Sequence, residues 1–531
     1  MSSLLKSNLA VASGTAMSRV SGLLRVMAFG YVLGRSSLTD AYNQANSSPN
    51  LVYELVIGGV LSSTLVPLFT RLHHDKDAEG EKAVRSVTLV VLAILTALAV
   101  AAAPLIFRLY NATTSVDVDQ ATYQKVGSLL AAFFLLQIFF YGVNALAGAQ
   151  LQARGRFFAA AWAPALSNVV IIVTLLYVPH TVNNGTATLA EVLDNTALRW
   201  TLGLGATLGI AMMAIALIPS LVRADVPFAF KADFRNPAVG ELRRVGGWAL
   251  GYVIANQVSI LVVQNLLFRS GAGNQTSYVN GFTFFVLPHG LLGVSIATTF
   301  LPEMTRAIAD RDRKRLVERT SLGIRLVALL TIPAGFGLFV LRRAITGVAL
   351  EHGECDAACA LTASRALGGF ALGLGAFSIY LFALKPFYAH RDTRTPFVLN
   401  LGQNLINIVL AVVLYRQFGM IGIAAAFALA YVVAALWSLQ ILSYKIRDFE
   451  LKPVLSGLYR VVLASVIMAE AVWAVARLVG GNTGMQSVLR IVVAGTVGVG
   501  VYASMLLLLR APELDALMAK LGRPRRDATA Q

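Results

Sequence analysis

Apolar runs of about twenty residues recur along almost the whole chain, and this pattern constrains the fold more than any other feature. A helix of that length crosses the hydrocarbon core of a bilayer. We count fourteen such runs, centred near residues 20, 58, 96, 137, 168, 210, 255, 288, 330, 376, 405, 431, 468 and 498. Because 57% of the 531 residues are hydrophobic and only 13% are charged, a soluble enzyme with a membrane anchor is excluded. The sequence predicts an all-α polytopic membrane protein with about fourteen transmembrane helices.

The first apolar run contains two arginines, Arg19 and Arg25. Each arginine at the centre of a membrane helix opposes insertion by about 2.5–3.5 kcal/mol. Both fall on one arc of a helical projection with small polar residues and glycines, namely Gly14, Thr15, Ser18, Ser21 and Gly22. Such a pair either satisfies neighbouring carboxylates and carbonyls or forms a cationic site for an anionic head group. We favour the second interpretation, because intramembrane charges commonly mark functional sites.

Three more polar residues follow within thirty positions. Asp40 lies in a short external loop, where it is a helix cap, an ion-pair partner or a functional group. Asn50 follows Pro49 at the start of the second run, and Glu54 is an intramembrane charge of opposite sign to the two arginines. Pairing with one of these arginines is the simplest way to satisfy Glu54.

Lysine and arginine are divided unequally between the two sides of the membrane. The N-terminus, the even-numbered loops and the C-terminal tail carry 31 of the 44, the odd-numbered loops carry 11, and the remaining two lie in the first run. The positive-inside rule therefore places both termini in the cytoplasm. The net charge of +17 reflects this topology and anionic lipid neighbours, and nucleic acid is not an expected partner.

Motifs of catalysis are missing from the sequence. It contains no glycine-rich phosphate loop, no zinc-protease motif and no hydrolase nucleophile elbow. The only cysteines, Cys355 and Cys359, lie in a predicted external loop, where a local disulfide and two free thiols are both open. A metal site with His352 is disfavoured, since no second ligand pair accompanies it. We expect no cofactor and no metal, and the membrane potential or an ion gradient would drive any transport.

Two sequence echoes indicate an internal repeat at an offset of 235 to 239 residues. The pattern Gly58, Thr64, Pro67, Thr70, Arg71 is matched by Gly293, Thr299, Pro302, Thr305, Arg306, and residues 152–168 resemble residues 388–407. Six helices separate the echoes, so the halves are parallel repeats about a pseudo-two-fold axis. We expect a six-helix lobe over residues 1–225, a second over 226–450, two extra helices in 451–510 and a disordered cytoplasmic tail over 511–531.

Polar residues in the later spans are candidates for ion coupling. His289 follows Pro288 in the eighth run and is either a protonation switch or a packed, hydrogen-bonded core residue, which we favour. Asn256, Asn404 and Asn407 either hold helices together or coordinate a cation between the seventh and eleventh helices.

Several short motifs together resemble the MurJ/MviN family of lipid II flippases, within the MATE-like exporter superfamily. They are residues 18–25, Thr39-Asp40-Ala41, Pro49-Asn50-Leu51, the segment 288–302 and the segment 387–396. The resemblance covers essentially the whole chain. It implies two six-helix lobes around a central cationic cavity that contains Arg19, Arg25 and Asp40. It also implies a lipid-tail groove at the last two helices and alternating access for an undecaprenyl-diphosphate-linked peptidoglycan precursor.

The chain departs from the family pattern at two places. Tyr53 and Glu54 stand where Gram-negative members have an arginine pair, and Thr283 and Val286 stand where they have an arginine and a glutamate. The expected cavity is therefore less cationic than the family pattern.

Taken together, these features predict a flippase of the bacterial inner membrane that moves lipid II and breaks no bond. The expected substrate-binding residues are Arg19, Arg25, Asp40, Ser18, Asn50 and Glu54. The expected partners are the lipid-linked substrate, membrane lipids and proteins of cell-wall synthesis or division. The alternatives are transport of another polyprenyl-linked glycan, export of drug cations, and a glycosyltransferase with Asp40 as its catalytic carboxylate.

Overall fold

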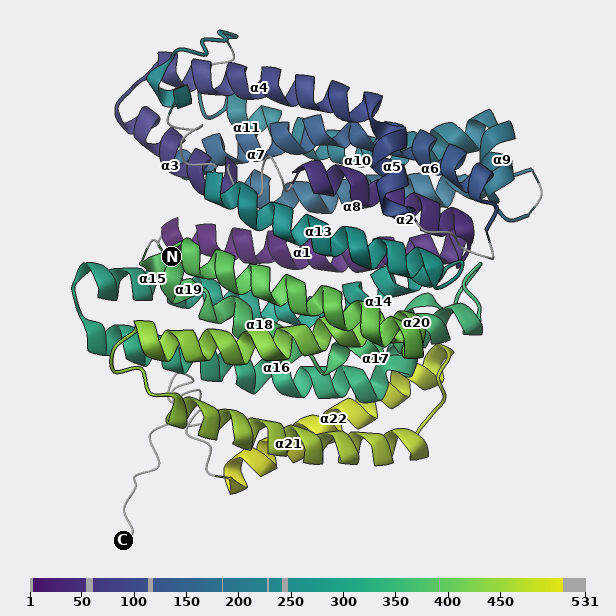
Figure 1. Cartoon of the computed structure of the whole chain (residues 1–531), viewed down its shortest axis with the longest axis vertical. Coiled ribbons are helices and arrows are strands. Elements are labelled where there is room, and N and C mark those ends of the chain that lie inside the picture. The colour runs from purple at the N-terminus through teal and green to yellow at the C-terminus, as the bar shows by residue number, and fades with distance from the viewer. Residues whose placement is uncertain are drawn as a thin grey trace. The chain divides into compact units, whose positions relative to one another are not determined.

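A computed structural model of the chain describes residues 3–53, 61–112, 118–183, 185–226, 229–240, 247–390 and 392–509 (Figure 1). These residues form helices joined by short connections, and none of them forms a strand. The expected all-α fold class is confirmed. Two compact units are present, Met1–Thr276 with His352–Asp356 (unit 1) and Ser277–Glu351 with Ala357–Gln531 (unit 2).

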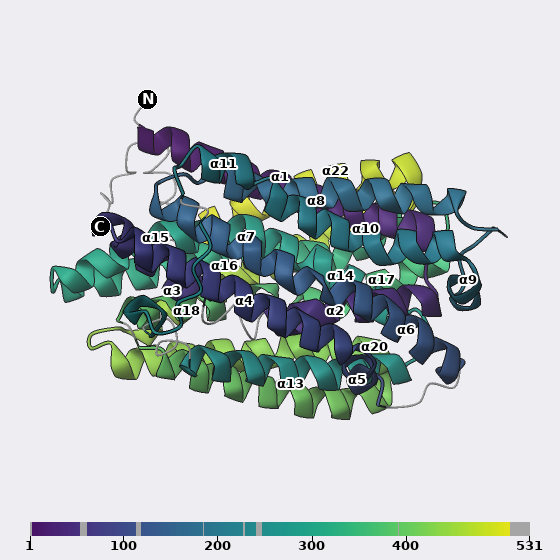
Figure 2. The ribbon, with the colours of Figure 1, turned by 90° about the horizontal axis from the view of Figure 1, so that it is seen from above.

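Unit 1 contains the helices of the N-terminal half. They are α1(Ser3–Leu33), α2(Ser37–Tyr53), α3(Leu61–His74), α4(Ala78–Ala101), α5(Ala103–Tyr110), α6(Gln120–Leu135), α7(Gln137–Ala153), α8(Phe158–Tyr177), α9(Leu189–Asp194), α10(Thr196–Ile215), α11(Ile218–Val222) and α13(Gly247–Arg269). Helix α8 packs against both α1 and α10, and Figure 2 shows these helices alongside one another. The approach of α1 to α8 is close because Gly14 has no side chain: a Cβ there would lie 2.8 Å from the Cβ of Ala161.

The position of α2 in unit 1 is fixed by aromatic and amide contacts. The ring of Tyr42 lies 5.1 Å from that of Phe29 and 4.9 Å from that of Phe134. Two residues further along α2, the buried amide of Gln44 accepts a hydrogen bond from the hydroxyl of Tyr123 at 2.9 Å. These contacts hold the N-terminal half of α2 in place within unit 1.

Unit 2 contains the helices of the C-terminal half. They are α14(Asn274–Pro288), whose first turn belongs to unit 1, the π-helical turn η3(His289–Gly293), α15(Val294–Ala309), α16(Arg313–Leu350), α17(Ala357–Ala371), α18(Leu374–Ala383), α19(Lys385–Ala389), α20(Arg394–Lys445), α21(Leu451–Leu478) and α22(Gly484–Leu508). The last two helices pack against each other and against α16. Helix α20 contains 52 residues and is interrupted at Gly419, where φ is +55°. Glycine tolerates this angle, and the interruption separates the two spans expected near residues 405 and 431.

Nine of the described helical segments are long and apolar enough to cross a membrane, or ten if the bent pair of α17 with α18–α19 counts as one span. Together they contain the centres of all the expected spans except those near residues 20, 58 and 255. Helices α1 and α13 cover two of these, with 31 and 23 residues, and residues 54–60 lie outside the described part of the chain. The count of fourteen therefore stays a prediction.

The repeat predicted from the sequence has counterparts in local structure. Thr70 on α3 donates a hydrogen bond to the carbonyl of Val66 at 2.7 Å, and its counterpart Thr305 on α15 donates to the carbonyl of Leu301 at 2.9 Å. Helix α7 ends at Ala153, and α19 ends 236 residues later at Ala389. The same sequence pattern thus forms the same element boundary in both halves. The lobe boundaries at residues 225 and 450 stay predictions.

Candidate functional site

The two arginines of α1 lie beside an exposed apolar face. Met17, Val20 and Leu24 are 44%, 56% and 49% exposed, as expected for side chains in contact with lipid. Arg19 and Arg25 are half-buried, and neither forms an ion pair with any described carboxylate. An arginine in a membrane helix without an acidic partner is available to an anionic ligand.

The small residues of the same arc pack against α8. The side-chain amide of Asn168 donates to the carbonyl of Ser18 at 3.2 Å and to the hydroxyl of Ser21 at 3.0 Å. Ser18 therefore contributes its carbonyl to a helix–helix contact, while its side chain is half-buried. Part of the arc predicted from the sequence is thus packed against α8. Sequence reasoning gave Asn168 no role in this contact, although an amide within an apolar run is the usual signal of one.

Arg25 on α1 also lies near α2. It lies close enough to Tyr42 for an electrostatic interaction with that hydroxyl. Asp40 and Asn50, expected in the same site, lie on α2 as well, and ten residues of helix separate them by about 15 Å. They therefore lie at different depths along α2. Of the side chain of Asn50 nothing is described, and Glu54 lies outside the described residues.

Asp40 is buried and has a full set of hydrogen bonds. One carboxylate oxygen accepts from the backbone N–H of Gly273 at 2.6 Å. The other accepts from the backbone N–H of Thr276 at 2.8 Å and from its hydroxyl at 2.7 Å. Asp40 precedes the expected second span. Burial raises the pKa of its carboxyl to about 6, although the hydrogen bonds from Thr276 and Gly273 lower it. Asp40 thus caps the first turn of α14.

Two neighbours of Asp40 strengthen this connection. The guanidinium of Arg35 donates to the amide oxygen of Asn274 at 3.0 Å, and the amide of Asn43 donates to the hydroxyl of Thr276 at 3.0 Å. We call this set the Asp40 latch: Arg35, Asp40 and Asn43 on one side, and Gly273, Asn274 and Thr276 on the other. Its two sides lie more than 230 residues apart in the sequence, so no local pattern could have revealed it.

The candidates for ion coupling lie in both units. In unit 1, Asn256 is half-buried on α13. In unit 2, Asn404 donates to the carbonyl of Asn400 and to its amide oxygen, at 3.0 and 3.1 Å, and Asn407 is buried on the same helix. These bonds within α20 agree with a structural role for Asn404, and a cation site stays a prediction.

His289 is buried within unit 2. Its Nδ1 lies 2.9 Å from the hydroxyl of Ser378, and its ring contacts Phe377 edge-on at 4.7 Å between centroids. This packing matches the interpretation of His289 as a hydrogen-bonded core residue.

Thr283 and Val286 on α14 are the positions where the chain departs from the family pattern. The hydroxyl of Thr283 donates to the carbonyl of Val279 at 2.9 Å. It is neutral and bonded within its own helix, so it does not supply the charge that the family pattern has at this position.

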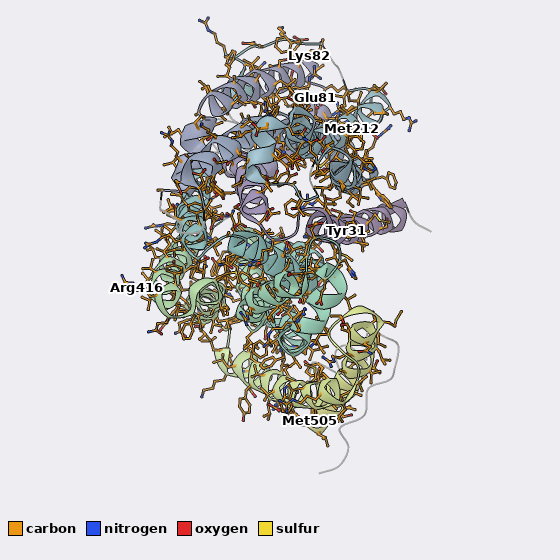
Figure 3. The ribbon with its side chains drawn as sticks, turned by 90° about the vertical axis from the view of Figure 1, so that its right-hand side faces the viewer. Tyr31, Glu81, Lys82, Met212, Arg416 and Met505 are labelled. Atoms are coloured by element: carbon orange, nitrogen blue, oxygen red, sulfur yellow. The ribbon has the colours of Figure 1, made fainter. Side chains whose placement is uncertain are left out.

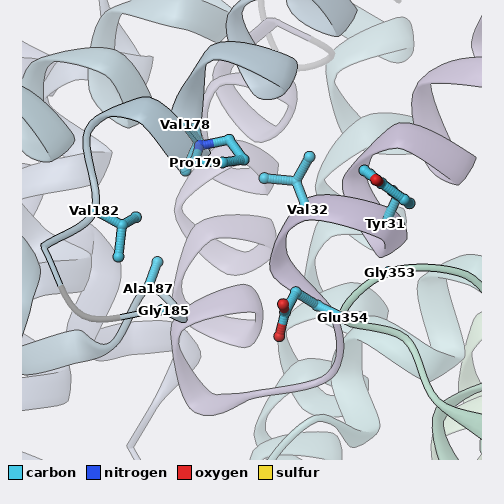
Figure 4. A pocket seen from close by; sticks show the side chains of 9 residues that line it. All are labelled: Tyr31, Val32, Val178, Pro179, Val182, Gly185, Ala187, Gly353 and Glu354. Carbon is cyan, nitrogen blue, oxygen red and sulfur yellow. The ribbon is translucent and has the colours of Figure 1, made fainter.

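A pocket of about 210 Å³ lies at one end of α1, away from the arginines (Figure 4). Tyr31 and Val32 line it together with Glu354, whose carboxylate is shown among mostly apolar neighbours. The other lining residues include Val178, Pro179, Val182, Gly185 and Ala187. The backbone N–H of Glu354 donates to the carbonyl of Tyr31 at 2.9 Å. Both cysteines in this region are disulfide-bonded, which decides between the alternatives left open by the sequence.

The fold and the arginine-bearing helix define the chain as a polytopic membrane transporter. A model of the family described as "Lipid II flippase MurJ" matches residues 29–494. The chain belongs to this family, and it is a multi-pass protein of the inner membrane whose family activity is transport of a lipid-linked substrate. The resemblance stated from the motifs is thereby confirmed.

Known relatives and structures agree with this assignment. A "Probable lipid II flippase MurJ" of Vibrio cholerae is 28% identical over 437 residues, which cover 80% of each chain. A "Lipid II flippase MurJ" of Thermosipho africanus is 26% identical and aligns with 84% of this chain and 88% of its own. The fold matches a solved lipid II flippase MurJ in an inward closed conformation, with a TM-score of 0.77 and 21% identity over 94% and 99% of the two chains. An inward-facing multidrug MATE transporter matches with a TM-score of 0.64 and 14% identity, over 82% of this chain and 98% of its own.

Proposed function

We propose that this chain moves lipid II from the inner to the outer face of the cytoplasmic membrane, with Arg19 and Arg25 as the groups that bind its diphosphate. The observation that carries the binding site is the lack of a described acidic partner for either half-buried guanidinium. Guanidinium groups donate paired hydrogen bonds to phosphate oxygens, and such charge-assisted bonds are among the strongest in proteins. Three of the other expected site residues, Ser18, Asn50 and Glu54, would surround the head group.

Alternating access requires that one side of the site close while the other opens. The Asp40 latch supplies a closure that can be broken and remade, because hydrogen bonds join residues 35–43 to residues 273–276. Asp40 would act as a positioning residue, through Gly273 and Thr276, and the substrate would pass outward when these bonds open. The latch then keeps the outer side closed while lipid II enters from the cytoplasm.

The remaining features of the proposal follow from the sequence. Transport breaks no covalent bond, so no catalytic residue is needed, and the membrane potential or an ion gradient supplies the free energy. Asn256, Asn404, Asn407 and His289 are the candidates for coupling an ion to transport. Both termini face the cytoplasm, and enzymes of cell-wall synthesis or division are the expected protein partners. Transport of another polyprenyl-linked glycan would use the same diphosphate contacts.

The test of the binding site compares substitutions at Arg25. Arg25→Ala removes an intramembrane charge that has no acidic partner among the described residues. This eases insertion by about 2.5–3.5 kcal/mol, so the protein should reach the membrane but fail to transport. Arg25→Lys keeps the charge without the paired donors and should be intermediate. The measurements are membrane abundance and complementation of a strain depleted of its own flippase.

A double variant separates binding from structure. If Arg25 chiefly satisfied Glu54, Arg25→Ala would leave that carboxylate unpaired and lower the abundance of the protein. Adding Glu54→Gln would then restore both abundance and activity. Recovery in the double variant would refute substrate binding by Arg25, whereas abundant but inactive protein in both alanine variants supports it.

A further inference from the structure

A cavity of about 250 Å³ lies within unit 2, apart from the arginines of α1. Its walls are formed by η3 and α15, with His289, Gly293, Val294 and Thr298, and by α18 and α19, with Ser378 and Lys385. Val294 and Thr298 are exposed, so the cavity reaches the surface of unit 2. We call it the Lys385 cavity.

The charges of the lining favour an anion. The half-buried ammonium of Lys385 is the one permanent charge among the lining residues, and none of them carries a carboxylate. Lys385 forms no ion pair with any described residue, and its Nζ lies 5.9 Å from the ring centroid of Tyr388. A partly desolvated ammonium without a counter-charge is stabilised when an anion occupies the space in front of it.

The geometry around His289 provides a second donor. When Nδ1 of His289 carries its proton and donates to Ser378 Oγ, 2.9 Å away, the hydroxyl of Ser378 keeps its own proton for a ligand. Gly293 makes this arrangement possible, because a Cβ at that position would lie 2.8 Å from Nδ1 of His289. The π-helical turn at residues 289–293 thus places the imidazole beside Ser378, and such turns occur often at functional sites.

We propose that the Lys385 cavity binds a phosphate group, either the head group of a phospholipid or a free phosphate ion. Phosphate suits the cavity better than a halide, because its oxygens point in several directions and can accept from donors on separate walls. The expected topology places α19, which bears Lys385, near the cytoplasmic surface, where lipid phosphates lie. The site involves neither Arg19 nor Arg25 and does not depend on the proposed transport of lipid II.

Two arms of one experiment distinguish the sources of phosphate. In the first, the full-length chain in a neutral detergent is titrated with inorganic phosphate against chloride at equal ionic strength, and the midpoint of thermal unfolding is followed. In the second, the chain is placed in phosphatidylglycerol nanodiscs without free phosphate, and retained lipid is counted by native mass spectrometry. A response in the first arm alone assigns a free ion, and a response in the second alone assigns a head group; each supports the site.

The variants decide whether the response comes from this cavity. Lys385→Gln should weaken phosphate binding about tenfold or more, or lose one retained lipid, because a charge-assisted hydrogen bond is lost. Lys385→Arg should retain binding, and Ser378→Ala should weaken it by a smaller factor. Lys452→Gln, at an exposed lysine of the same unit, should leave both responses unchanged.

Equal responses of the unsubstituted chain and Lys385→Gln in both arms would overturn the proposal. If Lys385→Gln fails to fold, Ser378→Ala carries the test, and unchanged binding by that variant would overturn it equally.

Discussion

Arg19 and Arg25 show how far a single residue can be interpreted from the sequence. Because inserting an arginine into lipid is costly, we expected both side chains to avoid lipid. Both are half-buried beside an exposed apolar face. Asp40 shows the opposite case. Its partners at Gly273 and Thr276 lie more than 230 residues away, so its position in the sequence left a cap, an ion pair and a functional role equally open.

The Asp40 latch gives a prediction at this scale. Asp40→Ala removes the acceptor for two buried backbone N–H groups, and each unsatisfied group costs about 1–3 kcal/mol, so the latch should open more often. Gln275→Cys reports opening, because Gln275 is fully buried and its amide has no hydrogen bond in the described structure. With both native cysteines replaced by serine, an impermeant maleimide added outside should label Gln275→Cys faster when Asp40 is alanine. Equal labelling rates would contradict the latch.

The pH dependence of the same labelling has a definite sign. Burial raises the pKa of Asp40 to about 6, above its usual value of 3.8, so protonation favours the closed latch over an open one in which Asp40 meets water. The closed latch should gain stability as the pH falls through 6 toward 4 and lose it as the pH rises. Labelling of Gln275→Cys, normalised to an exposed cysteine at the same pH, should therefore decrease between pH 7.5 and 5. In Asp40→Ala this dependence should disappear, and its persistence there would assign it to another group.

At the scale of the element, helix ends are held by ion pairs of very different burial. Glu81 near the start of α4, labelled in Figure 3, accepts a hydrogen bond from Arg154, just beyond α7, at 2.7 Å, and the two side chains are 4% and 7% exposed. Glu79, two residues earlier, is 55% exposed and pairs with Lys231 and Lys82 at 2.6 and 2.9 Å.

Removing one partner of the buried pair should be far more damaging than removing one partner of the exposed pair. Glu81→Gln leaves the Arg154 charge uncompensated and should lower the free energy of unfolding by about 3–5 kcal/mol. Glu79→Gln is the matched control on the same helix and should change stability little, because exposed pairs contribute weakly. Denaturation of the purified variants in one detergent measures both. Similar losses in the two variants would show that burial does not control the strength of these pairs.

The disulfide gives a second prediction at the scale of the element. Cys355 and Cys359 enclose a short segment, so their bond stabilises the chain by about 2 kcal/mol at most through loop closure. The double variant Cys355→Ser, Cys359→Ser should unfold at a slightly lower temperature and still complement a depleted strain. Loss of complementation at normal membrane abundance would show that the segment contributes directly to transport.

The positions of the helices could be predicted from the sequence better than the interruptions within them. Apolar runs marked most spans, because burial in lipid requires continuous apolar helices. The π-helical turn after Pro288 and the interruption at Gly419 depend on tertiary packing, and nothing in the apolar pattern distinguished these two positions from other prolines and glycines. Asn168 and Glu81 were missed for the same reason: each role depends on a partner from another helix.

At the scale of the whole molecule, the charge distribution predicts the topology of the chain. With 31 of the 44 basic residues on one side, reporter fusions after Gln531 and within residues 351–359 should lie on opposite faces, the first in the cytoplasm. Both reporters on the same face would contradict the fourteen-span topology.

The central claim is that the chain moves lipid II, and reconstitution tests it most directly. Purified chain is placed in vesicles with a fluorescent lipid II, a membrane potential is imposed, and an impermeant reductant added outside bleaches the accessible lipid. The account predicts that bleaching proceeds beyond the outer-leaflet fraction in vesicles with the unsubstituted chain, and stops at that fraction in protein-free vesicles and with the Arg19→Ala, Arg25→Ala variant. Equal bleaching in all three preparations would contradict it.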